Sequence, residues 1–382
     1  MSEAKSDFED FKNLRYIKKL IRATQDDPQA LNIMIWGAPG IGKSISIKEF
    51  TEEENIGFLD TRLSQLDSID LRGFPKLDGE GYADFVPFKN VLPIPEIHGD
   101  KGILFLDEVN LASIDVMKAG YQLLTEKKIG GYTLPPLWRI VLAGNRPEDA
   151  PGLIRDLPEP LKNRVYHFTV NPPRTDEARQ DLFTWQYKNK VHPSIIAFLK
   201  MNPAHIHDMT HARTENAWPS PRSWVMASDA IKNMKLGKDD GTVDVSGKNF
   251  EEIIFLVGNA VGNGAAIDFA HFTKIYERLP SARDILESGI NSIPEDKRPG
   301  KKDNAVIWAL LTSMVAYLRE PALHKDPEVI KNYIEFLGMI PKEFAIKSFR
   351  DCGAMPEVWS YITKEAAYKK FAVENSSYVR FS

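Results

Sequence analysis

Eight consecutive residues have the types and spacing that bind the phosphates of a nucleotide. Residues 37–44 read Gly-Ala-Pro-Gly-Ile-Gly-Lys-Ser and fit the pattern G-x-x-x-x-G-K-[ST]. Glycines let such a backbone curl until successive N–H groups point inward at phosphate oxygens. Lys43 is expected to reach the β- and γ-phosphates as a point charge, and the Ser44 hydroxyl to ligate Mg²⁺. The predicted binding set is this phosphate loop with the residue after it: Gly37, Ala38, Pro39, Gly40, Ile41, Gly42, Lys43, Ser44 and Ile45.

Two adjacent carboxylates end a second apolar run. Residues 102–108 read Gly-Ile-Leu-Phe-Leu-Asp-Glu, which is typical of a buried strand. Ligands of a parallel sheet bind beyond the carboxyl ends of its strands, so both acids should face the same edge as the phosphate loop. We predict that Asp107 holds the Mg²⁺ shell and that Glu108 accepts a proton from the attacking water. The alternative for Glu108 is a solvated carboxylate at a strand end.

A polar amide ends a third apolar run. Residues 138–145 read Trp-Arg-Ile-Val-Leu-Ala-Gly-Asn. An asparagine at the end of such a strand can orient water against the γ-phosphate, and this is the role we predict for Asn145. The alternative is an Asx turn before Pro147.

The elements that must position these side chains follow from the hydrophobic pattern. The pattern predicts strands at 31–36, 56–63, 102–108, 138–145 and 165–170, which alternate with helices at 46–54, 113–127 and 157–164. Gly130-Gly131 predicts a hairpin turn within 128–134. This alternation favours a parallel α/β sheet covered by helices on both faces.

Four regions are expected along the chain. An amphipathic helix at 6–25 lies in an N-terminal region, 1–30, and the α/β core spans 31–171. The strand signals then stop, and we predict a helical lid at 172–292 and a helical C-terminal extension at 293–382. Residues 294–302 are rich in Pro, Gly and charge, as linkers are.

One long connection stands out within the core. Residues 67–98 are rich in Gly and Pro and carry the aromatics Phe74, Tyr82 and Phe85. A segment of this length favours an inserted helix or hairpin, or a functional loop. These aromatics could grip a substrate, but local packing is the role that we favour for them.

Composition excludes several classes of protein. The 382 residues carry a formal charge of −4, which gives no electrostatic footprint for non-specific nucleic-acid binding. Cys352 is the single cysteine, so an internal disulfide is excluded and a reducing compartment is favoured. The polar N-terminus does not look like a signal peptide, and no apolar run approaches the ~20 residues that span a bilayer. We expect a cytoplasmic protein that does not associate with membranes.

In their order along the chain, these motifs resemble the AAA+ ATPases, and among them the MoxR-like group. The resemblance covers about residues 10–280 and is sharpest at 33–168 and 218–224. It implies an AAA+ P-loop NTPase core, with a parallel five-stranded sheet flanked by helices, followed by an all-α lid. It also implies that Arg164 is the arginine finger, with Arg155 as the alternative, and that Arg222 is the sensor 2 arginine. The hairpin at 128–134 resembles the pre-sensor hairpin, and 67–98 resembles the segment that the family inserts after its second strand.

The resemblance further implies an ATPase that uses ATP and Mg²⁺ in a homo-oligomeric ring, expected to be a hexamer. Such a ring would remodel or activate a partner protein, with a von Willebrand A-domain protein as an expected partner. Two other functions stay open: a nucleic-acid-dependent motor or GTP-driven restriction subunit, and a non-catalytic nucleotide-dependent scaffold. The charge makes nucleic acid an unlikely partner, and residues 144–149 do not match the Asn-Lys-x-Asp guanine reader.

Overall fold

The protein divides into two compact units in a computed structural model. The first unit spans Met1–Arg174 and the second Thr175–Ser382. The structure describes residues 12–27, 31–77, 79–80, 82–147, 149, 154–212, 214–238, 243–274, 280–295, 298 and 304–374. Residues 6–11 of the predicted first helix and most of the predicted linker at 294–302 lie outside these ranges.

A five-stranded parallel sheet forms the centre of the first unit. The strands are paired in the order β2-β5-β8-β1-β9, and every pair is parallel. In this order β1, which precedes the phosphate loop, lies next to β8, which is followed by Asn145. β8 in turn lies next to β5, which leads to Asp107 and Glu108. All five predicted strands are present: β1 (Asn32–Trp36), β2 (Gly57–Arg62), β5 (Lys101–Asp107), β8 (Leu137–Gly144) and β9 (Val165–Thr169).

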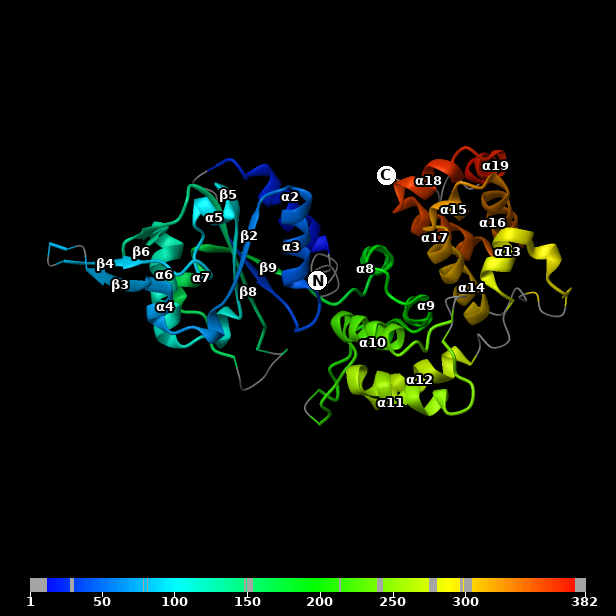
Figure 1. The fold of residues 1–382 in the computed structure, drawn as a ribbon, viewed down its shortest axis with the longest axis horizontal. Coiled ribbons are helices and arrows are strands. Elements are labelled where there is room, and N and C mark those ends of the chain that lie inside the picture. Colours follow the sequence, from blue (N-terminus) through cyan, green and yellow to red (C-terminus); the bar gives the residue numbers. More distant parts are fainter. Residues whose placement is uncertain are drawn as a thin grey trace, which may run out of the picture. The chain divides into compact units, whose positions relative to one another are not determined.

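Helices cover both faces of this sheet (Figure 1), which is why its central strands are almost wholly apolar. α2 (Lys12–Ala23) and α3 (Lys43–Glu53) lie on one face, and α4 (Ser68–Arg72), α6 (Ile114–Glu126) and α7 (Glu159–Lys162) on the other. The short α5 (Pro95–His98) precedes β5. With the helical second unit after it, this sheet confirms the predicted fold class, a parallel five-stranded α/β core followed by a helical region.

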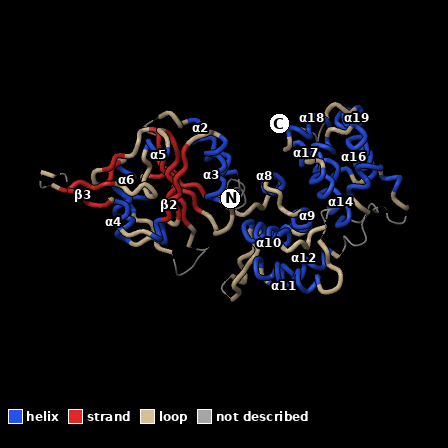
Figure 2. The backbone as a smooth tube through the Cα atoms, in the orientation of Figure 1, coloured by secondary structure: helices blue, strands red, loops and turns tan. Residues whose placement is uncertain are grey.

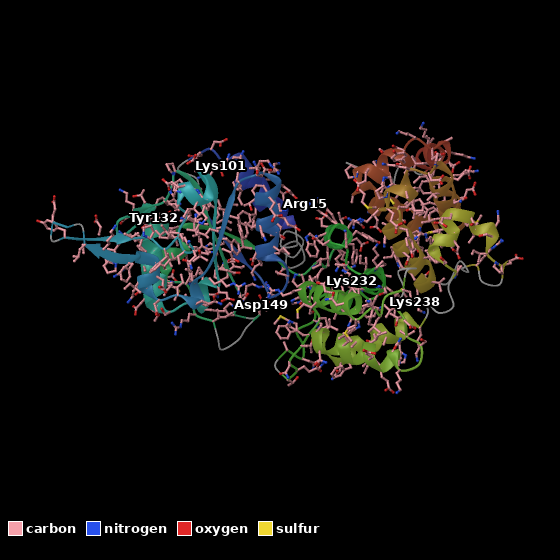
Figure 3. The ribbon with its side chains drawn as sticks, viewed as in Figure 1. Arg15, Lys101, Tyr132, Asp149, Lys232 and Lys238 are labelled. Carbon is pink, nitrogen blue, oxygen red and sulfur yellow. The ribbon has the colours of Figure 1, made fainter. Side chains whose placement is uncertain are left out.

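Two hairpins lie outside the main sheet. The Gly-Gly turn predicted at 130–131 joins β6 (Lys128–Ile129) to β7 (Tyr132–Thr133), and the predicted hairpin is confirmed. The Tyr132 hydroxyl (labelled in Figure 3) donates a 2.7 Å hydrogen bond to the carbonyl of Pro93, and burial raises the pKa of this phenol. The segment after β2 forms a second hairpin, β3 (Phe74–Leu77) with β4 (Ala83–Val86).

The aromatics of this second hairpin are exposed, so the local packing that we favoured is wrong. Phe74, Tyr82 and Phe85 are 63%, 73% and 36% exposed. The reason is geometric: the β3–β4 ribbon projects from the body of the first unit, and no third strand among the described residues pairs with it (Figures 1 and 2). Gly73 lies at the base of the ribbon with φ 98°. A β-carbon there would lie 2.4 Å from the carbonyl oxygen of Val86, so this position requires a glycine.

The second unit is helical throughout its described part, apart from one isolated bridge between Gly237 and Val243. A single hydrophobic cluster includes residues from both the predicted lid and the predicted extension. The longer helices of the second unit are α8 (Asp176–Lys188), α9 (Pro193–Met201), α10 (Pro221–Asn233), α11 (Asn249–Val261), α12 (Asn263–Thr273), α14 (Asn304–Tyr317), α16 (Pro327–Met339) and α17 (Lys342–Gly353). The shorter ones are α13 (Ala282–Ser288), α15 (Pro321–His324), α18 (Pro356–Ile362) and α19 (Ala366–Glu374).

A buried ion pair joins the predicted lid, 172–292, to the predicted C-terminal extension, 293–382. The Lys200 ammonium on α9 contacts the Asp351 carboxylate on α17, and the two side chains are 4% and 2% exposed. Two residues on α8 complete the network: the Lys200 ammonium donates to the Tyr187 hydroxyl at 3.1 Å, and the Gln180 amide donates to the Asp351 carboxylate at 2.5 Å. Each charge is therefore matched and hydrogen-bonded, which a buried pair requires.

Cys352 is predicted to be inert in the native protein. Its thiol is fully buried on α17 with the Tyr333 hydroxyl 3.3 Å away, and burial raises the thiol pKa to about 12. The reactive species is the thiolate, which is therefore scarce and inaccessible at pH 8. We expect negligible alkylation by iodoacetamide in native protein and complete alkylation in denaturant, read by intact mass. Rapid native labelling would contradict this burial.

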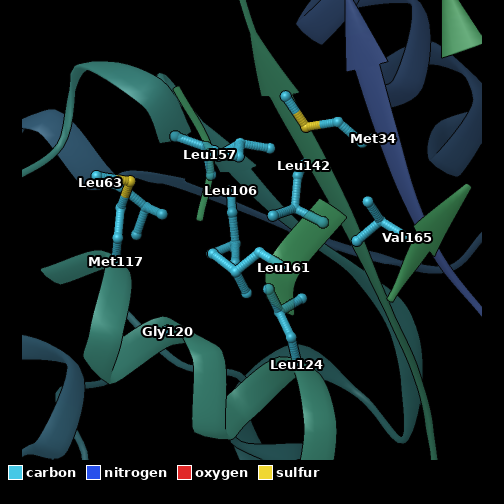
Figure 4. Close-up of a pocket in the computed structure, with 11 residues that line it drawn as sticks. Met34, Leu63, Leu106, Met117, Gly120, Leu124, Leu142, Leu157, Leu161 and Val165 are labelled. Atoms are coloured by element: carbon cyan, nitrogen blue, oxygen red, sulfur yellow. The ribbon is translucent and has the colours of Figure 1, made fainter. Parts of the chain in front are cut away.

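A small cavity between the sheet and α6 makes Gly120 a site for a stabilising substitution (Figure 4). The cavity measures about 20 Å³, its lining is apolar, and an added β-carbon at Gly120 meets nothing within 4 Å. Alanine in a helix interior is favoured over glycine by about 1 kcal/mol. We expect Gly120→Ala to raise the free energy of unfolding by about that amount, measured by denaturant titration.

Gly102→Ala is the matched contrast in the same unit. Its β-carbon would lie 2.7 Å from the Trp138 ring and 2.6 Å from the carbonyl oxygen of Gly57. We expect this variant to lose about 1–3 kcal/mol through overpacking. Equal effects from the two substitutions would contradict the packing described here.

No helix in the described ranges is long and apolar enough to cross a bilayer.

Candidate nucleotide-binding site

The phosphate loop is anchored at the carboxyl edge of the sheet. Gly37 N–H donates to the Gly144 carbonyl at 3.2 Å, and Val170 N–H donates to the Trp36 carbonyl at 2.7 Å. Gly42 takes a left-handed conformation, with φ 97°, and α3 begins directly after it at Lys43. The helix therefore starts three residues earlier than predicted. Lys43 and Ser44 lie in its first turn, where backbone N–H groups lack partners within the helix and the helix dipole favours anions.

The Lys43 side chain connects the loop to the end of β8. It is buried, and its ammonium donates to the carbonyls of Gly37 and Ala38 at 2.7 and 3.1 Å. A third hydrogen bond, of 3.1 Å, reaches the Asn145 side-chain oxygen. The structure thus brings together two predicted site residues that are 102 positions apart in the chain.

The two predicted metal ligands also meet. Ser44 Oγ donates to Asp107 Oδ2 at 3.0 Å, and Asp107 Oδ1 accepts the Glu108 N–H at 2.8 Å. A hydroxyl and a carboxylate are oxygen donors of the kind that Mg²⁺ prefers, and this ion usually takes only one or two protein ligands beside phosphate oxygens. The donor set therefore fits Mg²⁺ held together with a triphosphate. No group of three or more His, Cys, Asp or Glu in the described ranges is placed to hold a metal.

Glu108 is held by a residue that the sequence motifs did not point to. Ser64, in the short turn Leu63–Gln65 that follows β2, donates its hydroxyl to Glu108 Oε2. Glu108 itself takes the left-handed conformation, with φ 57°, which is uncommon for a residue with a side chain. β2 and β5 pair in parallel, so the residues after their ends are neighbours, and that pairing is the only signal for Ser64.

A third carboxylate, Asp60 on β2, lies near the two acids. Partial burial raises the pKa of Asp60, and the charges of Asp107 and Glu108 raise it further, while Arg62 opposes them. Three carboxyl groups therefore lie close enough at this part of the sheet for their charges to interact. Asp60 lies inside a predicted strand and matches no motif.

Arg164 lies at the end of α7 on the surface of the first unit. Its guanidinium donates to the Pro160 carbonyl at 3.0 Å and lies 5.1 Å from the centroid of the Tyr121 ring on α6. Arg155, the alternative, instead donates from its guanidinium to the Ala112 carbonyl at 3.4 Å.

Arg222 belongs to the second unit, and its position relative to the loop stays a prediction. It lies in the first turn of α10, after the N-cap residue Ser220, and is exposed. Its neighbour Trp224 is fully buried and packs on Phe198, 5.4 Å between ring centroids. Trp224 therefore belongs to the core of the unit and does not stack on Arg222.

Comparisons with known proteins give the chain no family name. No model of a protein family matches the chain, and no curated protein does. Among solved structures, a variant of RuvB from Thermotoga maritima is 14% identical with a TM-score of 0.35, covering 81% of this chain and 82% of that one. A second variant of the same protein gives 14% and 0.34 over the same shares.

Proposed function

We propose that the chain is a MoxR-like AAA+ ATPase, which hydrolyses ATP with Mg²⁺ at the subunit seams of a ring and so remodels or activates a partner protein. The observation that carries the proposal is the convergence of Lys43, Ser44, Asp107 and Asn145. Two hydrogen bonds, Ser44–Asp107 and Lys43–Asn145, join the phosphate loop to the ends of two other strands. A phosphoryl-transfer site needs this meeting of cation, metal ligands and polar amide.

Each residue of the site has its own role in the proposed hydrolysis. The loop N–H groups and Lys43 hold the β- and γ-phosphates, while Ser44 and Asp107 hold Mg²⁺. When bound, the ion neutralises charge on the β- and γ-oxygens. Glu108 accepts a proton from the attacking water, and Asn145 helps to hold that water in line.

Ser64 holds the Glu108 carboxylate through one oxygen, which restricts the rotation of the proposed base. This contact leaves the second carboxylate oxygen to face the water. The hydrolytic step is then one of positioning and charge stabilisation, with little covalent work for the protein.

Arg164 acts on the nucleotide of the neighbouring subunit, and Arg222 acts on the nucleotide of its own. In this proposal its exposed guanidinium, which contacts a carbonyl and an aromatic ring of its own subunit, reaches across the seam to a second copy of the chain. A head-to-tail contact of this kind closes into a ring. By resemblance, we propose a hexamer.

The β3–β4 hairpin is our candidate for contact with the client protein. It presents Phe74, Leu77, Tyr82 and Val86 to solvent, at 63%, 73%, 73% and 46% exposure. Several exposed apolar side chains on one projecting element favour contact with another protein. A von Willebrand A-domain protein is the partner that the family resemblance suggests.

The two other functions are separated from the first by one experiment. Turnover of ATP and GTP is measured over a hundredfold range of protein concentration, with and without duplex and single-stranded DNA. We expect ATP-specific turnover per subunit that rises with concentration and does not respond to DNA. Strong stimulation by DNA would favour a nucleic-acid motor, and GTP preference a restriction-type subunit. Absence of turnover at the highest concentration would favour a scaffold.

A further inference from the structure

The Asn110 side chain pairs with the backbone of Asn145 in the way that one peptide group pairs with another. Asn110 Nδ2 donates to the Asn145 carbonyl at 2.6 Å, and the Asn145 N–H donates to Asn110 Oδ1 at 3.2 Å. Asn110 is 1% exposed, so water does not compete for these two bonds. Both the donor and the acceptor of its amide are used on a single residue.

The same asparagine touches two further parts of the site. It lies in the short turn Val109–Leu111, directly after the proposed base Glu108, whose carbonyl accepts the Leu111 N–H at 2.9 Å. Its own carbonyl accepts the N–H of Arg155 at 3.0 Å. Three segments that are far apart in the sequence, at 108–111, 144–145 and 155, therefore meet at one buried side chain and its peptide group.

Gly144 makes this approach possible. A β-carbon there would lie 2.7 Å from Asn110 Oδ1 and 2.8 Å from the Met34 methyl group. Because both contacts are below the distance that real β-carbons tolerate, a glycine is required for Asn110 to sit against the strand end. The Gly144-Asn145 pair thus fits Asn110 as a unit.

We propose that Asn110 is a positioning residue for Asn145, which holds the polar amide at a fixed distance from Glu108 and from the segment that leads to Arg164. The inference rests on the proposed function, because Asn145 has a task only if the site handles a γ-phosphate and water. Asn110 touches neither of these. It fixes the backbone of Asn145, and the side chain of Asn145 then meets Lys43 at 3.1 Å.

The chain offers a matched control in Asn32. It is 4% exposed, donates from Nδ2 to the Leu124 carbonyl at 2.9 Å, and accepts a hydrogen bond from Lys127. It begins β1, at the opposite end of that strand from the phosphate loop. Asn110→Leu and Asn32→Leu each remove two hydrogen bonds of a buried amide in the same unit, but only the first lies at the site.

Two measurements test the proposal. The first is ATP turnover with kcat and KM separated. For Asn110→Leu we expect kcat to fall about 10- to 100-fold, since a displacement of about 1 Å has that effect, with KM within about threefold of wild type. Asn32→Leu should keep the wild-type kcat. A similar loss of kcat in both variants would mean general destabilisation and would overturn the proposal.

The second measurement is amide hydrogen exchange at Asn145 and Arg155, which needs no activity. Asn110→Asp keeps the shape of the side chain but sets a carboxylate oxygen against the Asn145 carbonyl, and the repulsion between them should separate the two groups. This variant serves if Asn110→Leu does not fold. We expect faster exchange at the Asn145 amide in the Asn110 variants and wild-type exchange in Asn32→Leu. The Arg155 amide is a local reference, because it donates to the backbone carbonyl of residue 110, which the substitutions keep. Unchanged exchange at Asn145 overturns the proposal even if the enzyme is active. Faster exchange in a protein whose wild type hydrolyses no ATP would remove the proposed function alone and leave the structural role of Asn110 in place.

Discussion

Glu108→Gln will bind MgATP as the wild type does and will hydrolyse it about 10²- to 10⁴-fold more slowly, the range that a general base supplies. Glutamine keeps the shape of the side chain and its acceptor oxygen, so the Ser64 hydroxyl retains a partner. What is lost is the capacity to take a proton from water. The measurement is steady-state phosphate release together with equilibrium binding of a fluorescent ATP analogue.

Asp60→Asn is the control for this substitution. Asp60 is a carboxylate on the neighbouring strand, and its charge acts on the same edge of the sheet. If loss of negative charge alone were responsible, both variants would lose turnover to the same degree. A Glu108→Gln protein that keeps wild-type turnover would remove Glu108 from the mechanism.

Arg164→Ala will lower turnover about 10³- to 10⁵-fold, the range for an arginine finger supplied in trans, while nucleotide binding by the subunit is retained. The loss should be partly restored by mixing. A ring that contains both Arg164→Ala and Glu108→Gln subunits has some seams with an intact Arg164 facing an intact Glu108. We therefore expect the mixture to exceed the sum of its two inactive components, measured by phosphate release at equal total protein.

Arg22→Ala is a closely matched control for the arginine. Its guanidinium is likewise exposed, lies 5.4 Å from an aromatic centroid (Phe50) and has an acceptor in Glu54. It is on α2 of the same unit, and turnover of this variant should be that of the wild type. Mixed rings that show no gain, or an Arg155→Ala variant that shows the loss in place of Arg164→Ala, would contradict the assignment of Arg164.

The elements that position the site were largely predictable because each has a strong local signal. Apolar runs predicted β1, β5 and β8, and the glycine-rich spacing predicted the phosphate loop. The Gly-Gly turn of the β6–β7 hairpin depends on local backbone freedom, which a short stretch of sequence carries.

The supporting residues were not predictable, because each acquires its contact from strand order. Ser64 reaches Glu108 only because β2 pairs with β5, and Asn110 reaches Asn145 only because β5 pairs with β8. The exposed aromatics of β3–β4 were misjudged for a related reason. A Phe in a Gly- and Pro-rich segment is buried only if another element packs over that segment. The sequence of the segment does not indicate whether one does.

The Lys200–Asp351 pair limits where the chain can be shortened. A protein that ended near residue 303 would keep the ammonium on α9 inside an apolar surround of Phe183 and Tyr187 but would lack its counterion. Stranding a charge in this way costs about 3–5 kcal/mol, a large part of the stability of an ordinary domain. The C-terminal helices are thus needed for the stability of the helices that precede them. A truncation would destabilise those helices, so its effect on activity would not reveal the role of the C-terminal helices.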